Sequence, residues 1–331
     1  MGSPDPEHGR QLNGMGGGVS SLSKICVVSS PTPKQQQQGI QVEYTFVQVG
    51  IRDSSIDYSG NCGNLSSMIG VFARDEGLCA PPPAGASEMT VRSFNTNTSK
   101  IIDTTFPIED DVAVLDRPEV TVAGVPGKGS EIIMEFVNPG GARTGKLLPT
   151  GTPVDTLQIA GRTLQASLVD ATNPTVFVSA AELREFLAFD EYIASSSSAE
   201  ATRVSEILEL IRQSGAERMG LDPNAQAQPK IAILGEDGDG DADVMVHSLS
   251  MGVLHKAIPM TVGLCVGVAA NIPNTLAWKI VQQKHPSKRN MVRIRHPGGS
   301  VDVGAEMNGD EAKSAKVIRT GRRLMKGVVW Y

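Results

Sequence analysis

The sequence has few cysteines and none of the spacings that would pair them. Its 331 residues contain four, at Cys26, Cys62, Cys79 and Cys265. There is no Cys-x-x-Cys pair, and no histidine stands at the spacing of a zinc ligand. We therefore expect neither a metal site nor a disulfide framework, but free thiols in a reducing compartment.

The sequence also lacks a strongly basic region and a long hydrophobic run. The formal net charge is −6 and the pI is near 5.5, and no Lys/Arg run is interleaved with aromatic residues. The most apolar run, residues 257–273, carries prolines near both ends and is too short to cross roughly 30 Å of hydrocarbon. No signal-peptide pattern opens the chain. We expect a soluble cytoplasmic protein that binds neither nucleic acid nor a membrane.

Glycine (35) and proline (20) are abundant, whereas aromatic residues make up only 4% of the chain, which favours many short strands joined by tight turns. The length exceeds the size at which a single core stops growing, roughly 250–300 residues. Helical patterns are few and fall at residues 63–76, 180–194, 199–214, 261–271 and 309–316. An irregular segment at 137–157 contains four glycines and three prolines. We therefore expect one domain of residues 1–150 and a second, similar in plan, of residues 151–331.

Cys62 lies at the predicted start of the first helix. The apolar residues of that helix form one stripe at helical spacing, namely Leu65, Met68, Ile69 and Phe72. At a helix start, unpaired N–H groups and the positive end of the dipole stabilise a thiolate and also bind carboxylates. Gly60 and Gly63 allow close approach to the backbone, and Asn61 and Asn64 add amide donors. The alternative is a small buried cysteine beside a tight turn.

Lys24 leads directly into the apolar strand of residues 25–28. A lysine that is shielded from water at the start of a strand can lose its proton and act as a base. The alternative is a lysine at the strand end whose amine is solvated. At the second helix start, Thr261 is expected to cap the helix, which places Cys265 one turn further in and in the core. A racemase with two catalytic thiols is disfavoured, because the chain supplies only one exposed thiol.

Several stretches together resemble a known family. They are "MGSPDPEHGRQLNGMGGGVSSLSK", "DYSGNCGNLSSMIGVFARDEGL", "VRSFNTNTSKII", "VNPGGARTGKLLPTG", "SLVDATNPTVFV", "HKAIPMTVGLC" and "IRTGRRLMKG". These stretches, spread over nearly the whole chain, are similar to the PrpF family, which includes methylaconitate, methylitaconate and aconitate isomerases and oxalomesaconate tautomerase. The resemblance implies an α+β, diaminopimelate-epimerase-like fold: two pseudo-symmetric domains, each a curled antiparallel sheet around a central helix, with the active site in the cleft between them.

The resemblance also implies cofactor-independent isomerisation of an unsaturated polycarboxylate, with no metal, and it leaves a homodimer open. The family's active-site lysine and cysteine fall on Lys24 and Cys62. Relatives usually carry a further N-terminal stretch that forms the first strand and one wall of the site. The printed sequence begins after it, so we expect that wall to be missing. A non-catalytic protein that binds polycarboxylates is the alternative from a different class.

The implied reaction is allylic proton transfer, in which Lys24 or Cys62 removes the proton; the sequence leaves the choice between them open. The groups expected to hold the substrate carboxylates through amide and backbone donors are Asn61, Gly63, Asn64, Met260 and Thr261. The hydroxyl groups expected to assist are those of Ser21, Ser23 and Ser300. An amino-acid epimerase or racemase on the same fold is the second alternative.

Overall fold

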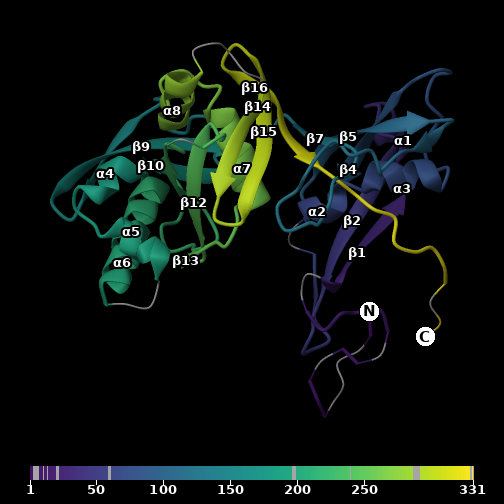
Figure 1. Ribbon diagram of the computed structural model, residues 1–331, viewed down its shortest axis with the longest axis horizontal. Helices are drawn as coiled ribbons and strands as arrows, with labels where there is room; N and C mark the ends of the chain where they lie inside the picture. The colour runs from purple at the N-terminus through teal and green to yellow at the C-terminus, as the bar shows by residue number, and fades with distance from the viewer. Residues whose placement is uncertain are drawn as a thin grey trace. The chain divides into compact units, whose positions relative to one another are not determined.

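The computed structural model describes residues 1–2, 7–9, 11–12, 14–19, 22–58, 61–195, 199–238, 240–285, 291–328 and 330 (Figure 1). The chain divides into two compact units. Unit 1 comprises Met1–Thr121, Pro126–Glu135 and Arg319–Tyr331, and unit 2 comprises Val122–Val125 and Phe136–Ile318.

This division differs from the expected domains of residues 1–150 and 151–331. The Gly/Pro-rich segment 137–157, which spans the expected domain boundary, lies within unit 2, where hydrogen bonds to the buried carboxylate of Asp170 hold it. The Oδ2 atom of Asp170 accepts hydrogen bonds from the backbone N–H groups of Arg143 (2.8 Å) and Thr144 (2.7 Å). At the other end of the chain, Arg323 in unit 1 forms an ion pair with Asp75 (2.6 Å).

Unit 1 is built on a small mixed sheet. Its strands are β1 (Lys24–Ser29), β2 (Val42–Val49), β3 (Ile56–Asp57), β4 (Glu88–Asn95), β5 (Lys100–Glu109), β6 (Val112–Ala113) and β7 (Ile132–Val137), and its helices are α1 (Pro33–Gln36), α2 (Gly63–Ser66) and α3 (Ile69–Asp75). The strand order is β1-β2-β4-β5-β7, with β3 paired to β2 and β6 paired to β5. The β1–β2 and β4–β5 pairs are antiparallel, and β2–β4 is parallel.

The sequence of β2 alternates as its burial does, because successive side chains of a strand point to opposite faces. Val42, Tyr44 and Phe46 are buried, whereas Glu43 and Thr45, which lie between them, are only partly buried.

The helix expected at 63–76 is divided into α2 and α3, and its buried face differs from the expected apolar stripe.

In α3 the side toward the sheet carries small residues. A Cβ atom on Gly70 would lie 3.1 Å from the Phe106 ring and 3.2 Å from Val91 and Thr104. The missing side chain therefore lets the helix backbone approach β4 and β5 closely. Phe72, which belongs to the predicted apolar stripe, is 46% exposed.

Unit 2 contains the larger set of elements. Its strands are β8 (Asp155–Ile159), β9 (Arg162–Ala171), β10 (Asn173–Ser179), β11 (Lys230–Gly235), β12 (Val244–Ser250), β13 (Val253–Leu254), β14 (Met291–His296), β15 (Gly299–Asn308) and β16 (Glu311–Arg319), the last of which ends in unit 1. Its helices are α4 (Ala180–Arg184), α5 (Phe189–Ala194), α6 (Ala199–Arg218), α7 (Met260–Ala269) and α8 (Leu276–Lys284). The strand order is β16-β15-β14-β12-β11-β10-β9-β8, and the pairs are antiparallel except β10–β11 and β12–β14.

Helix α7 is the central helix of unit 2 and packs on β15, β9 and β10. From Val262 to Ala269 every residue of it is buried, so the helix is apolar on all sides. Gly267 allows this packing, because a Cβ atom there would lie 3.0 Å from the backbone nitrogen of Gly304 in β15.

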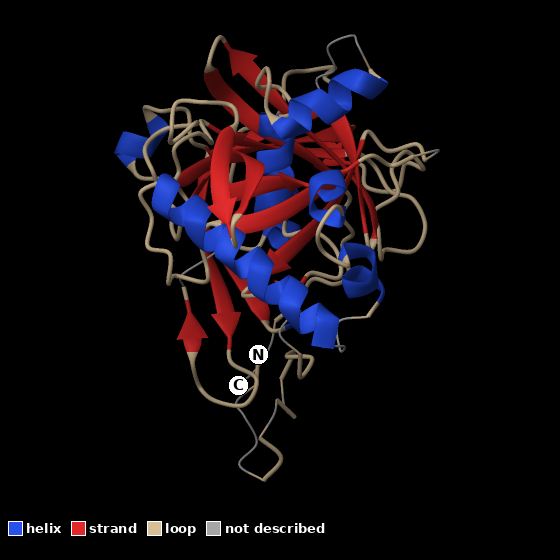
Figure 2. Cartoon of the chain, turned by 90° about the vertical axis from the view of Figure 1, so that its left-hand side faces the viewer, coloured by secondary structure: helices blue, strands red, loops and turns tan. Residues whose placement is uncertain are grey.

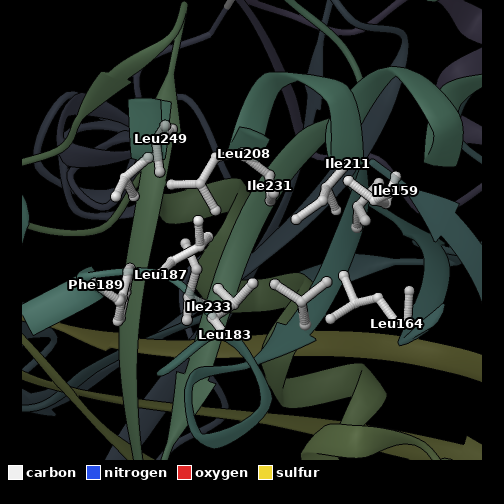
Figure 3. Packing of buried hydrophobic residues seen from close by; sticks show 14 of the residues in the cluster. Ile159, Leu164, Leu183, Leu187, Phe189, Leu208, Ile211, Ile231, Ile233 and Leu249 are labelled. Carbon is white, nitrogen blue, oxygen red and sulfur yellow. The ribbon is translucent and has the colours of Figure 1, made fainter. Parts of the chain in front are cut away.

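A second apolar cluster lies between the helices α4–α6 and strands β8–β12, and Figure 3 shows its side chains pointing toward one another. Leu183, Phe189 and Leu208 from the helices meet Ile231 and Ile233 from β11. Figure 2 shows the longest helix, α6, crossing in front of the strands. No helix among the described residues is long and apolar enough to cross a membrane.

The helix expected at 309–316 is wrong, because these residues form the turn and first half of a hairpin strand. β15 and β16 pair from Val303↔Val317 to Asn308↔Glu311. The connecting loop is Gly309–Asp310, with Gly309 at φ +59°, where glycine carries no steric penalty.

Candidate active site

Lys24 and Cys62 lie side by side in unit 1. The Nζ atom of Lys24 donates to the Sγ atom of Cys62 at 3.6 Å, across 38 residues of sequence. Lys24 is the first residue of β1, and both side chains are half-buried. The sequence-based expectation that an amine and a thiol lie together is met, although their catalytic role stays a prediction.

Cys62 is the N-cap residue of α2, as its position before the first turn predicted. Its backbone is extended (φ −109°, ψ 106°), and its carbonyl accepts from the N–H groups of Leu65 and Ser66, both at 3.0 Å. The thiol makes no capping hydrogen bond. The sulfur is therefore left to interact with the amine of Lys24.

A ring of hydrogen bonds lies beside this cysteine. The Asn61 amide nitrogen donates to the Tyr44 hydroxyl (3.0 Å), which lies 2.8 Å from the Ser66 hydroxyl. Ser66 donates to the Asn61 amide oxygen and lies within hydrogen-bond distance of the Cys62 carbonyl oxygen, both at 3.0 Å. Tyr44 and Ser66 are fully buried. The sequence analysis missed both residues, because alternation marks Tyr44 as core but does not reveal its polar partners.

A second thiol, Cys26, shares the face of β1 that carries Lys24, because the two residues are two positions apart in the strand. Burial, and next the neighbouring Cys62, raises the pKa of Cys26 to about 12. At neutral pH Cys26 is therefore a neutral thiol beside the reactive pair.

The remaining predicted residues of unit 1 differ in their surroundings. The hydroxyl of Ser23 is buried and donates to the Gln11 side chain (2.7 Å) and the Val19 carbonyl (3.0 Å). Asn64 is exposed, and Gly63 begins α2. Ser21 lies outside the described residues. The substrate-binding roles assigned to these residues stay predictions.

Met260, Thr261 and Ser300 belong to unit 2. The N-cap of α7 is Pro259 rather than the expected Thr261, so the helix begins two residues earlier than that cap predicts. The Thr172 hydroxyl donates to the Thr261 carbonyl at 2.8 Å, which fastens the first turn of α7 to the end of β9. Ser300 pairs with Arg295 across β15 and β14.

Cys265 lies in the core, as predicted. It is fully buried in α7, and its thiol lies 3.6 Å from the Val169 carbonyl. Burial raises its pKa to about 12. Cys265 is therefore unsuited to exchange protons with a substrate.

A hollow of about 1220 Å³ in unit 1 lies elsewhere, between α3 and residues 322–327. Phe72 and Arg323 line it, whereas Lys24 and Cys62 do not. The chemistry of the site therefore rests on the Lys24–Cys62 contact and not on this hollow.

Comparison with known proteins decides the family. The PrpF protein family model matches residues 1–331. The chain belongs to the PrpF family. It is 32% identical to the 3-methylitaconate isomerase of Eubacterium barkeri, over 100% of this chain and 87% of that protein. It is 35% identical to the 2-methyl-aconitate isomerase of Cupriavidus necator, over 99% of this chain and 86% of that protein.

A solved structure of methylitaconate-delta-isomerase matches this PrpF protein with a TM-score of 0.85 and 31% identity, covering 99% of this chain and 85% of that one. The expected family, an α+β fold and the enzyme class, isomerase, are confirmed. The expectation of purely antiparallel sheets is wrong, because β2–β4, β10–β11 and β12–β14 pair in parallel.

Proposed function

We propose that this PrpF protein is a cofactor-independent isomerase that shifts or inverts the C=C bond of an unsaturated tricarboxylate of the aconitate or 2-methylaconitate type. The observation that carries the proposal is the 3.6 Å contact between Lys24 Nζ and Cys62 Sγ. The name of the 2-methyl-aconitate isomerase supports this tricarboxylate class, and the name of the 3-methylitaconate isomerase, whose substrate is a dicarboxylate, supports the broader class of unsaturated polycarboxylates. Because the reaction needs the free thiol, the proposal includes a reducing, cytoplasmic location.

The amine and thiol together can hold and move one proton. In such a substrate, removal of the allylic proton leaves a dienolate whose negative charge spreads to a carboxylate. The group that has taken the proton then returns a proton to the far end of the allyl system. Alternatively, it first passes the proton to the other group of the pair, which returns it. The C–H bond at one end breaks, a C–H bond at the other end forms, and the double bond moves between them, with no net change in atoms or electrons.

Backbone and side-chain donors stabilise the charge that develops on the carboxylate, because donors oriented beforehand cost no reorganisation during the reaction. In unit 1 the proposal assigns this to the first turn of α2, with Gly63 and Asn64. In unit 2 it assigns the same role to the first turn of α7, with Met260 and Thr261.

A racemase that uses two thiols is disfavoured by the burial of Cys265 in α7. Such an enzyme needs one accessible thiol on each side of the reacting carbon, and burial keeps the Cys265 thiol protonated.

The test is incubation with cis-aconitate, and separately with 2-methylaconitate, in D₂O, followed by proton NMR of the vinyl and methylene signals. The expected result is isomerisation with deuterium entering the allylic positions of one of the two acids. Binding that raises the melting temperature without isomerisation or exchange would overturn the proposal and favour a non-catalytic binding protein. Cys62→Ser is the control for adventitious exchange.

A further inference from the structure

Tyr44, Ser66 and Asn61 form a closed ring of hydrogen bonds in which each group both donates and accepts. The Asn61 N–H donates to the Tyr44 hydroxyl, and the Tyr44–Ser66 contact allows either hydroxyl to donate. When the Ser66 O–H donates to the Asn61 amide oxygen, the Tyr44 O–H donates to Ser66 and the ring closes in one direction. Two buried hydroxyl groups are thereby satisfied at once, which burial requires.

The ring supports a helix that is too short to hold its own shape. Helix α2 spans only Gly63–Ser66, and a helix of one turn has little intrinsic stability. Its N-cap, Cys62, has no side-chain cap, so the backbone around the thiol depends on its neighbours. Asn61 precedes the cysteine directly, and the Ser66 hydroxyl also reaches the Cys62 carbonyl. The ring therefore fixes the backbone before Cys62 through Asn61 and the backbone after it through Ser66.

Strand β2 connects this ring to the amine. Tyr44 projects from β2, and the same strand pairs with β1, where Lys24 lies opposite Gln48 and Val28 lies opposite Tyr44. A single strand thus fixes Lys24 through the sheet ladder and Cys62 through the ring. The distance between the amine and the thiol depends on both connections.

We propose that the Tyr44–Ser66–Asn61 ring is a positioning unit that holds the Cys62 thiol against the Lys24 amine. This inference rests on the proposed function for its effect on turnover, but not for its effect on the thiol. Tyr44 itself exchanges no proton with substrate: its side chain is fully buried. Burial, the largest influence, also raises its pKa well above the ordinary value for tyrosine.

Tyr44→Phe is the decisive variant, because it keeps the aromatic side chain in the core and breaks two of the three hydrogen bonds of the ring, together with the hydrogen bond between the Tyr44 hydroxyl and the Asn95 side chain. A displacement of a catalytic group by about 1 Å costs roughly 100-fold in rate. We expect kcat to fall about 10- to 100-fold while KM changes by less than about twofold. Ser66→Ala should have a similar effect, and Tyr44→Phe with Ser66→Ala should cost little more than either alone, because all three residues act as one unit.

The matched control is Tyr192→Phe in unit 2. Tyr192 is also a buried tyrosine whose hydroxyl bonds a serine, Ser205. Its substitution removes a comparable hydrogen bond without touching the ring. Equal losses of melting temperature in the two variants, with loss of kcat only in Tyr44→Phe, separate positioning from general destabilisation.

A readout independent of isomerase activity is alkylation of Cys62 by iodoacetamide, followed by peptide mass spectrometry. In the otherwise wild-type protein, Lys24→Ala should slow alkylation at pH 7.5, because a positively charged amine beside the sulfur favours the thiolate that reacts. In the Tyr44→Phe background, Lys24→Ala should change the rate much less. If Lys24→Ala slows alkylation equally in both backgrounds, the positioning role is overturned, whether or not the wild type isomerises any substrate. If Tyr44→Phe does not fold, the same comparison in the Ser66→Ala background decides the question.

Discussion

The amine of Lys24 and the thiol of Cys62 are in direct contact although 38 residues separate them in sequence. In the proposed mechanism the two groups together take up and return one proton, so each depends on the other. Loss of either should therefore stop turnover and not merely weaken substrate binding.

We expect Lys24→Ala and Cys62→Ser each to lower kcat with the proposed substrate by at least about 100-fold, the usual contribution of a positioned acid or base. Steady-state kinetics with purified variants provides the measurement. Lys34→Ala is the matched control, since Lys34 is an exposed lysine of α1 in the same unit. Near-normal turnover in Lys24→Ala would remove the lysine from the mechanism.

The cysteines should differ sharply in reactivity. Burial raises the pKa of Cys26 and of Cys265 to about 12 each, so both remain protonated at pH 8. We expect iodoacetamide at pH 8 to label Cys62 well before either of them, and all four cysteines to react at similar rates in guanidinium chloride. Peptide mass spectrometry over time measures the order. Labelling of Cys26 as fast as Cys62 would contradict the assignment of Cys62 as the reactive thiol.

Replacing each of two glycines of α7 with alanine should change the free energy of unfolding in opposite directions. In Gly267→Ala the new Cβ would lie 3.0 Å from the Gly304 nitrogen and 3.1 Å from its oxygen, which are backbone atoms that cannot turn aside. We expect a loss of about 1–3 kcal/mol in the free energy of unfolding. In Gly263→Ala the nearest atom is 3.7 Å away, which is ordinary contact. There the higher helix propensity of alanine should stabilise the protein by up to about 1 kcal/mol.

Urea unfolding of the two glycine variants, followed by circular dichroism, gives both values against the wild type. Equal effects of the two substitutions would show that the close approach of α7 to β15 does not govern the packing of this helix.

His247 should make unit 2 more sensitive to acid. Burial, and next the charge of Arg184, lowers its pKa below the ordinary value of about 6.5. The unfolded chain therefore binds the proton more readily than the folded one. The stability that the neutral His247 side chain contributes is fully present above about pH 6.5. It is lost progressively as the pH falls from there toward the lower pKa of His247 in the folded protein.

We expect the difference in melting temperature between pH 7.5 and pH 5 to be smaller in His247→Gln than in the wild type. Differential scanning calorimetry at the two pH values measures it. If the variant loses as much on acidification as the wild type does, the buried imidazole is not the group responsible.

The two residues that the proposal assigns to proton transfer could be singled out from sequence, because both lie at element boundaries that local patterns reveal. Lys24 precedes an apolar strand, and Cys62 precedes a helix start marked by glycines and asparagines. Tyr44 and Ser66 could not be identified in this way. Their contact joins a strand to a helix, and nothing in the spacing of a single sequence shows which buried hydroxyls meet.

The errors in the fold have physical causes that local patterns also miss. Residues 311–316 contain good helix formers, but Asn308 and Gly309 precede them, and a glycine at this point favours a two-residue hairpin turn. Pairing with β15 then outweighs the helix propensity of alanine and lysine. In α3 the helix faces the strands with Gly70, whose missing side chain permits close approach, and Phe72 is exposed.

The connectivity of the two units has a consequence for how the chain can be divided. Unit 1 is assembled from three separate stretches of chain, which include residues 1–121 and 319–331, and the ion pair between Arg323 and Asp75 joins these two stretches. Unit 2 is interrupted as well, because residues 122–125 belong to it and residues 126–135 do not. A single cut of the polypeptide therefore isolates neither unit intact, and a gene fragment for the unit with Lys24 would have to join segments that are distant in sequence.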